Sequence, residues 1–445
     1  MNNKVPIEIQ TKANAWMATF WAYAQNWLGR SVTFLVFLIL ARLLSPEEFG
    51  AFAVALLFIT LGEVFVEQIF AQVIVQRETL TQLHLSSAFW GAMGLGLILS
   101  VAVYLIAPWY AEVFKIKSIE PIIAALSPIF LLMGLSSIHP ALLRRKLNYK
   151  VLAFRTMFAN FISGMTAIAV AFNGFGVWTF VIQLFVFYIL NFIVLWCNEP
   201  WRPNVVFSFV SLKELFRYSG YIAFTKFIDL VETRGVELIV ARILGVTILG
   251  YYMLAMKLFQ ALNQLFAAPL WDSSISILAR LQLQRERFLD TLKQKTKFTE
   301  LYIAPLFLIV FATSDILIPL AFGEKWIAVI VPFQFLCLLG ALRAGGFLLV
   351  VALQAIGDVS AVVKAGIVRV IVTFISVWLM LDKGLLGVVL SILLGQFLSI
   401  LIIFFLFAKY MNLSNFLLFR SVYTALTIVE AILAIALLVF IQYII

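Results

Sequence analysis

Long apolar segments recur along the whole chain, and they constrain its fold more than any other feature. A membrane-spanning helix needs about 20 mostly apolar residues. With 64% hydrophobic and 12% charged residues, the chain is far more apolar than a soluble domain, which is about half apolar and a quarter charged. We therefore expect an all-α integral membrane protein with about thirteen spans, at 15–43, 49–73, 86–111, 119–142, 151–172, 176–197, 217–242, 248–273, 299–321, 328–355, 360–381, 384–408 and 417–444.

The segments between these spans are short, and the longest are 198–216 and 274–298. They leave no room for a soluble catalytic domain. The two cysteines, Cys197 and Cys337, make neither a disulfide framework nor a metal-ligand pattern. We expect no catalytic residue, metal or cofactor. We also expect no nucleic-acid partner despite the net charge of +10, because Lys and Arg gather in the cytoplasmic loops of membrane proteins.

The distribution of positive charge predicts the orientation of the chain. Residues 1–14 are polar, and no signal-peptide pattern follows them, which indicates a cytoplasmic tail. With this tail in the cytoplasm, 21 of the 32 Lys and Arg residues fall in cytoplasmic segments, six in external turns and five inside spans. The bias favours a multi-pass protein with a cytoplasmic N-terminus.

The first external turn reads ARLLSPEEFG, residues 41–50. Pro46 cannot continue a helix and disfavours helical dihedrals at the residue before it. Ser45 is a good N-cap for the next helix, and Glu48 lies three residues later, at the capping-box spacing. The stretch therefore predicts a helix that begins at Pro46.

This turn has a second copy in the chain. LILARLLSPEEFG (38–50) and LIVARILGVTILG (238–250) share six of thirteen residues, at an offset of 200. A weaker pair joins GFGVW (174–178) to GLLGVV (384–389), and both pairs are six spans apart. Each span reverses the direction of the chain across the membrane, so two copies that are six spans apart have the same orientation. This predicts a parallel duplication, which is typical of transporters. The shared residues expected to serve this architecture are Arg42, Gly50, Arg242 and Gly250.

The duplication predicts the domain organisation. A twelve-helix core of two parallel six-helix bundles is followed by one extra C-terminal helix. The expected boundaries are a cytoplasmic tail at 1–14, a first bundle at 15–198, a cytoplasmic linker at 199–216, a second bundle at 217–410 and the additional helix at 411–445. Within the linker, residues 201–216 fit either a short amphipathic helix on the inner leaflet or a plain loop.

Charged residues inside the spans predict a central site. Each costs at least about 2.5–3.5 kcal/mol near the bilayer centre, so such residues usually face protein or water. We expect them to line a partly hydrated cavity, where the cations would bind a phosphate and the acids would separate the cations or relay an ion. The alternative is that they pair between helices and fix packing, which we favour for Glu63 and Glu67. The candidates are Arg30, Lys226, Asp229, Arg234, Glu237, Lys257 and Arg343.

Several phrases together resemble the polysaccharide transporter family, the oligosaccharide flippases of the Wzx/WzxC type. They are ARLLSPEEFG, VIVQRETLTQLHLSSAFW (73–90), GFGVWTFVIQ (174–183), WRPNVVFSFVSLKELFRYSG (201–220), ARILGVTILGYYMLAMKL (241–258) and FGEKW (322–326). That family shares a superfamily with the MATE multidrug exporters and the lipid II flippases. Its members have twelve or fourteen spans, whereas thirteen are predicted here.

The resemblance implies a MATE-like fold and a membrane transporter of the bacterial inner membrane. It would move an undecaprenyl-pyrophosphate-linked oligosaccharide for polysaccharide, lipopolysaccharide or exopolysaccharide biosynthesis. Implied partners are this lipid-linked oligosaccharide, membrane lipids, and a polysaccharide polymerase with other assembly proteins.

Two other functions fit parts of the sequence. A MATE-type antiporter for small molecules or cations would have the same fold, but its cavity should be dominated by acids, whereas cations at least equal acids in these spans. A membrane enzyme would need a sizeable external loop or paired catalytic groups, and neither stands out. We therefore expect a transporter and not an enzyme.

Overall fold

The computed structural model describes residues 31–76 and 80–411. Helices make up nearly all of this part, and no strand occurs in it. The expectation of an all-α membrane fold is therefore confirmed. The predicted N-terminal tail, Arg30 and the predicted last span at 417–444 lie outside the described residues.

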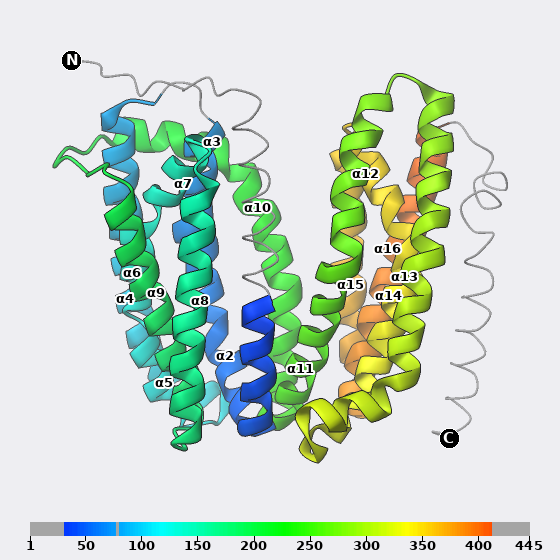
Figure 1. The fold of residues 1–445 in the computed structure, drawn as a ribbon, viewed down its shortest axis with the longest axis horizontal. Coiled ribbons are helices and arrows are strands. Elements are labelled where there is room, and N and C mark those ends of the chain that lie inside the picture. The colour runs from blue at the N-terminus through cyan, green and yellow to red at the C-terminus, as the bar shows by residue number, and fades with distance from the viewer. Residues whose placement is uncertain (1–30, 77–79, 412–445) are drawn as a thin grey trace. The chain divides into compact units, whose positions relative to one another are not determined.

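The chain divides into two compact units, one that ends at Gly250 and one that begins at Tyr251. This division falls inside α11 (Val246–Leu262), and Figure 1 shows the helices on both sides of it. After the apolar helix Ser31–Leu43, the first unit contains α2 (Pro46–Gly62), a π-helical turn (Glu63–Gln68), α3 (Ile69–Gln76), α4 (Gln82–Phe114), α5 (Ile119–Leu126), α6 (Ile129–Ser136), α7 (Ile138–Arg145), α8 (Tyr149–Phe172), α9 (Trp178–Asn198), α10 (Phe209–Ile239) and a second π-helical turn (Val240–Leu244).

The second unit has its own apolar core. Among its largest fully buried side chains are Phe288, Phe307, Trp326 and Phe407. Beyond α11 it contains a π-helical turn (Asn263–Ala267), α12 (Ala268–Leu281), α13 (Arg285–Phe322), a 3₁₀ turn (Glu324–Val329), α14 (Ile330–Ala355), α15 (Val359–Leu379), a 3₁₀ turn (Leu381–Lys383) and α16 (Gly384–Tyr410).

Nine helices in the described residues are long and apolar enough to cross a membrane. They coincide with nine of the thirteen predicted spans. Of the other four, 417–444 and half of 15–43 lie outside the described residues, 217–242 falls in the charge-bearing α10, and 248–273 is interrupted by the π-helical turn Asn263–Ala267. The count of thirteen is therefore not confirmed.

The start of α2 follows the sequence prediction closely. Ser45 has an extended backbone, its Oγ accepts a hydrogen bond from the amide of Glu48 at 3.3 Å, and the Ser45 amide donates to Glu48 Oε2 at 2.6 Å. Both halves of the capping box are formed, with Pro46 in the first helical turn. Local chemistry thus fixes where this helix begins.

Helix boundaries repeat along the chain, as the duplicated sequence predicts. α2 and α11 are both 17 residues long, begin 200 residues apart, and run into π-helical turns at Glu63 and Asn263. Later in the repeat the offset is 210. There Asn148 caps α8 and Asp358 caps α15, each by accepting a hydrogen bond from the amide three residues on. The second copy contains longer helices, since α13 has 38 residues and α4 has 33, and this contributes to the drift from 200 to 210.

Candidate functional site

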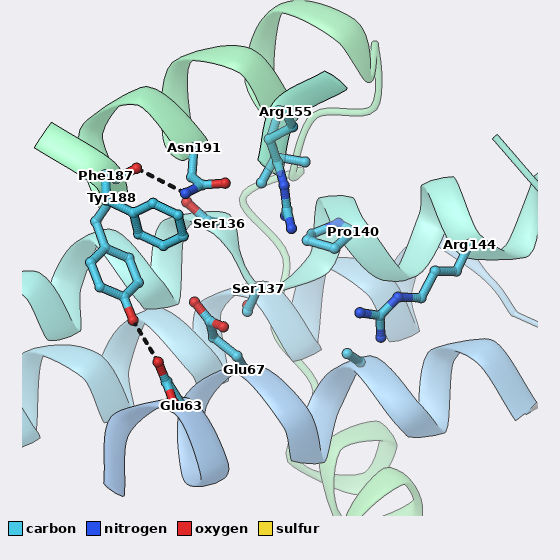
Figure 2. A pocket seen from close by; sticks show the side chains of 12 residues that line it. Glu63, Glu67, Ser136, Ser137, Pro140, Arg144, Arg155, Phe187, Tyr188 and Asn191 are labelled. Atoms are coloured by element: carbon cyan, nitrogen blue, oxygen red, sulfur yellow. Dashed lines mark hydrogen bonds between the residues drawn. The ribbon is translucent and has the colours of Figure 1, made fainter. Parts of the chain in front are cut away.

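A cavity of about 210 Å³, lined by charged, polar and apolar side chains, lies inside the first unit. Its walls come from the π-helical turn after α2, from the junction of α6 and α7, and from α8 and α9. Figure 2 shows the side chains that point into it. Its charged and strongly polar lining residues are Glu63, Glu67, Arg144, Arg155, Tyr188 and Asn191.

The π-helical turn places both glutamates on the cavity wall. Such turns occur mostly as single turns inside α-helices and frequently mark functional sites. Glu63 begins the turn and Glu67 lies near its end, and both line the cavity. Across from them, Tyr188 on α9 donates a hydrogen bond from its hydroxyl to Glu63 Oε1 at 3.1 Å.

Several buried polar atoms around the cavity have no hydrogen-bond partner among the described residues. They are Asn191 Oδ1, Ser136 Oγ and Arg155 Nε. Asn191 and Ser136 are each 6% exposed, and the amide group of Asn191 donates to the carbonyl of Phe187 at 2.8 Å. Buried polar groups in folded proteins are normally paired with protein or ordered water. The cavity is therefore suited to water or another small polar ligand.

The cavity lining contains equal numbers of acidic and basic side chains, two glutamates and two arginines. In Figure 2, Glu67 and Arg155 enter the space from opposite walls. Arg144 joins the lining from the end of α7. Opposite charges in one enclosure lower the cost of removing each from water. The arrangement can bind a polar group or exchange a proton.

The sequence prediction of the site centred on other residues. Arg234 and Glu237 are brought together, with Arg234 Nη1 donating to Glu237 Oε2 at 2.6 Å. Arg234 also donates from Nη2 to Thr60 Oγ1 at 2.9 Å, which ties α10 to α2 within the first unit. The ion pair therefore lies within α10, between residues three apart, and only the bond to Thr60 joins two helices.

Two other predicted site residues, Lys257 and Arg343, belong to the second unit. Lys257 is exposed on α11, and the guanidinium carbon of Arg343 lies 5.6 Å from the centre of the Phe347 ring on α14. Lys226 and Asp229 belong to α10, but their side chains, like the whole of Arg30, lie outside the described part of the structure. The assignment of these residues to a substrate site stays a prediction.

The repeated glycines have an architectural position. A Cβ atom on Gly50 would overlap the carbonyl oxygen of Val246, and one on Gly250 would overlap the carbonyl oxygen of Pro46. The two contacts are reciprocal, because each pairs one glycine with the first residue of the other helix. Arg42 and Arg242, by contrast, are both exposed. Glycine is required here for the close approach of α2 and α11.

Sequence reasoning missed most of the cavity. Glu63 and Glu67 stood out as two acids one turn apart in an apolar span, but they were expected to serve packing. Arg144 and Arg155 resembled ordinary inside-positive charges at span ends, and Asn191 lies unmarked in an apolar run. Their position around one cavity depends on the tertiary packing of the π-helical turn Glu63–Gln68 and the helices α7, α8 and α9, which carries no signal in the sequence.

Solved structures define the class of fold. The chain matches the lipid II flippase MurJ in an inward closed conformation, with a TM-score of 0.72 and 14% identity, over 94% of this chain and 92% of that one. It also matches an inward-facing multidrug resistance MATE family transporter, with a TM-score of 0.68 and 14% identity, over 86% and 94% of the two chains. The fold is therefore that of the MATE-like membrane transporters.

Sequence comparison then gives the family. A family model described as "Polysaccharide biosynthesis protein" matches residues 39–331, and the chain belongs to this family. It is 25% identical to the lipopolysaccharide biosynthesis protein WzxC of Escherichia coli (strain K12) over 385 residues, which are 83% of this chain and 76% of WzxC. It is 26% identical to the succinoglycan biosynthesis transport protein ExoT of Rhizobium meliloti (strain 1021) over 292 residues, 65% of this chain and 58% of ExoT.

Proposed function

We propose that this protein is a flippase that moves a lipid-linked oligosaccharide across the bacterial inner membrane. The observation that carries the proposal is its similarity to WzxC over 83% of the chain, in a fold that matches the lipid II flippase MurJ. The proposed substrate is an undecaprenyl-pyrophosphate-linked oligosaccharide destined for polysaccharide or lipopolysaccharide. The transport step makes and breaks no covalent bond, so no enzymatic chemistry is required.

The proposed mechanism is alternating access by two six-helix bundles, at 15–198 and 217–410, joined by the linker 199–216. A substrate site between repeats near the bilayer midplane is typical of transporters with internal duplication. The predicted cations Arg30, Lys226, Lys257 and Arg343 would bind the pyrophosphate, with Asp229 spacing them. Arg234 would exchange its partner Glu237 for phosphate oxygens, which guanidinium groups bind bidentately.

We further propose that the N-terminus is cytoplasmic and that the flippase works beside a polysaccharide polymerase and other assembly proteins. The excess of Lys and Arg on one side of the predicted topology supports this orientation. The linker 199–216 and the basic stretch 280–297 would then lie on the cytoplasmic side, where lipid-linked precursors are assembled.

A genetic experiment tests the proposal. Deletion of the gene should stop export of the glycan and cause the lipid-linked precursor to accumulate on the cytoplasmic side. Arg234→Gln should reproduce that loss while the protein stays inserted at normal levels. The matched control is Lys383→Gln, which changes an exposed charge in the turn before α16 and should export normally.

The same strains separate the flippase from the second candidate, a MATE-type antiporter for small molecules or cations. The MATE structural match favours this alternative at the level of fold. An antiporter would change resistance to toxic cations and leave the glycan unaffected. Normal glycan export in the deletion strain would contradict the flippase proposal.

A further inference from the structure

The segment between α9 and α10 presents large apolar side chains to its surroundings. We define the linker patch as Val205, Phe207, Phe209 and Val210, which are 92%, 55%, 70% and 69% exposed. These four residues lie within six consecutive positions, where the loop after α9 runs into the first turn of α10. Singly exposed apolar residues are normal on proteins, whereas a contiguous exposed group indicates an interaction surface.

The backbone of this segment is anchored on α4. Asn204 donates from its amide to Ser86 Oγ at 3.0 Å, and Ser208 donates from its amide to Ser87 Oγ at 2.9 Å. Both serines are fully buried. In return, the Trp90 indole donates to the carbonyl of Asn204 at 2.8 Å. The segment is therefore an extended loop with a defined position, which decides between the two predicted forms of its first half.

A second set of contacts fixes the loop where it leaves α9. Arg202 donates to the carbonyl of Trp196 at 2.7 Å and lies 5.0 Å from the centre of that ring. The Trp201 indole donates to Gln82 Oε1 at 2.8 Å, and Lys146 pairs with the buried carboxylate of Glu199 at 2.7 Å. The loop thus holds its polar groups toward the protein.

In the first turn of α10, as in the loop, some side chains pack against the protein while the apolar residues of the patch are exposed. Ser208 caps the helix by accepting a hydrogen bond from the amide of Ser211, and Ser211 is buried. Leu212 lies close to Gly91 of α4, where an added Cβ would come within 2.9 Å of its side chain. Phe209 and Val210 consequently point away from the bundle. Figure 1 shows this green loop projecting at the end of α9.

The position of the linker patch indicates that the membrane surface covers it. Two membrane-spanning helices meet the loop, since α9 ends at Asn198 and α4 begins at Gln82. Trp90 and Trp201 belong to the same end of the bundle, as expected at a membrane surface where indoles favour the head-group level. Lys213 is exposed beside the patch, and its charge complements anionic head groups.

We propose that the linker patch is a membrane-surface anchor whose apolar side chains enter the boundary between lipid head groups and acyl chains. An irregular backbone can lie at this depth when its polar groups are satisfied. The bonds to Ser86, Ser87 and Trp90 satisfy the amides of Asn204 and Ser208 and the carbonyl of Asn204. The partner is the lipid leaflet at the α4 and α9 end of the first unit. This role is independent of the proposed transport function.

The test uses the full chain in lipid nanodiscs with one fluorescent label. Cys197 is exposed and is first changed to serine, while Cys337 is buried and does not react. An environment-sensitive fluorophore is then attached at Val205→Cys or Phe209→Cys. The matched control is Leu283→Cys, because Leu283 is 94% exposed but has polar neighbours, Gln282 and Gln284.

Labels at 205 and 209 should emit at shorter wavelength than the label at 283. A nitroxide quencher attached to the upper acyl chain should quench them several-fold more strongly, and aqueous iodide several-fold less. Val205 is almost fully exposed, so its replacement leaves folding intact. Iodide quenching at 205 and 209 equal to that at 283 would overturn the proposal and leave a water-facing surface for a protein partner.

Discussion

The two π-helical turns that follow α2 and α11 have the same place in the repeat, but only the first carries acidic side chains. The turn at Glu63–Gln68 carries two acids, whereas its counterpart 200 residues later begins with Asn263 and ends with Ala267. Glu63 receives a hydrogen bond from Tyr188 on α9 and faces a cavity. Asn263 donates to the carbonyl of Phe259 in its own helix.

The comparison separates the features of the repeat that serve the fold from those that differ between the two copies. The helix length, the π-helical turn and the glycine four residues into each helix are kept in both copies. The side chains that face a cavity in the first copy are not. The geometry of α2 and α11 is therefore architectural, and the charges of the first turn are specific to the first unit.

The largest expected effect comes from the repeated glycines. Gly50→Val and Gly250→Val would each drive a side chain into the backbone of the other helix. Overpacking costs about 1–3 kcal/mol, and more when backbone must move, so both variants should lose most of their folded yield. Size-exclusion chromatography and thermal unfolding in detergent measure this.

The reciprocal geometry makes the two glycine variants a matched pair. Gly94→Ala on α4 is the control, because an added Cβ there meets no atom within 4 Å, and alanine favours a helix by about 1 kcal/mol over glycine. A clear difference between Gly50→Val and Gly250→Val would contradict the equivalence of the two contacts.

The next effect tests the charged cavity. Arg155→Leu leaves Glu63 and Glu67 with one fewer arginine in the lining, and an unsatisfied buried polar group costs about 1–3 kcal/mol. We expect a loss of this size in detergent unfolding, partly restored in the double variant Arg155→Leu with Glu67→Leu. The comparison variant, Asn263→Leu in the second turn, should stay within about 0.5 kcal/mol. Equal losses from Arg155→Leu and Asn263→Leu would remove the distinction between the surroundings of the two turns.

The N-terminal ends of α2 and α11 supply a third comparison. Ser45 caps α2 with its side chain, whereas Gly245 holds the same position before α11 with φ +94° and ψ 169°. That region is nearly restricted to glycine and costs other residues about 1–3 kcal/mol. Gly245→Ala should therefore destabilise more than Ser45→Ala, which loses a cap worth about 1 kcal/mol. The reverse order in thermal unfolding would contradict the assigned backbone.

The smallest effect concerns one hydrogen bond. Tyr188→Phe removes the donor to Glu63 and should lower stability by about 0.5–1.5 kcal/mol. Tyr410→Phe, at an exposed position near the end of α16, serves as the control and should unfold at the wild-type temperature. A wild-type midpoint for Tyr188→Phe would mean that this bond adds nothing to the first turn.

Local sequence signals predicted part of this structure well. Ser45, Pro46 and Glu48 encode the start of α2 in adjacent residues, and the six identities between 38–50 and 238–250 marked the repeat. Nine spans followed from apolar length alone. The π-helical turns could not be predicted, because a single inserted residue in the hydrogen-bond pattern leaves no composition signal. The cavity was missed because Glu67 and Arg155 come to line one space only through tertiary packing.

The central claim is that this chain flips a lipid-linked oligosaccharide, and one measurement tests it most directly. The purified protein is reconstituted into liposomes with the undecaprenyl-pyrophosphate-linked glycan that accumulates in the deletion strain. A membrane-impermeant glycosidase then reports how much glycan faces outward. We predict that the accessible share rises from the outer-leaflet fraction to nearly the whole pool, and that the Arg234→Gln protein does not produce this rise. An accessible share equal to that of protein-free liposomes would contradict the account.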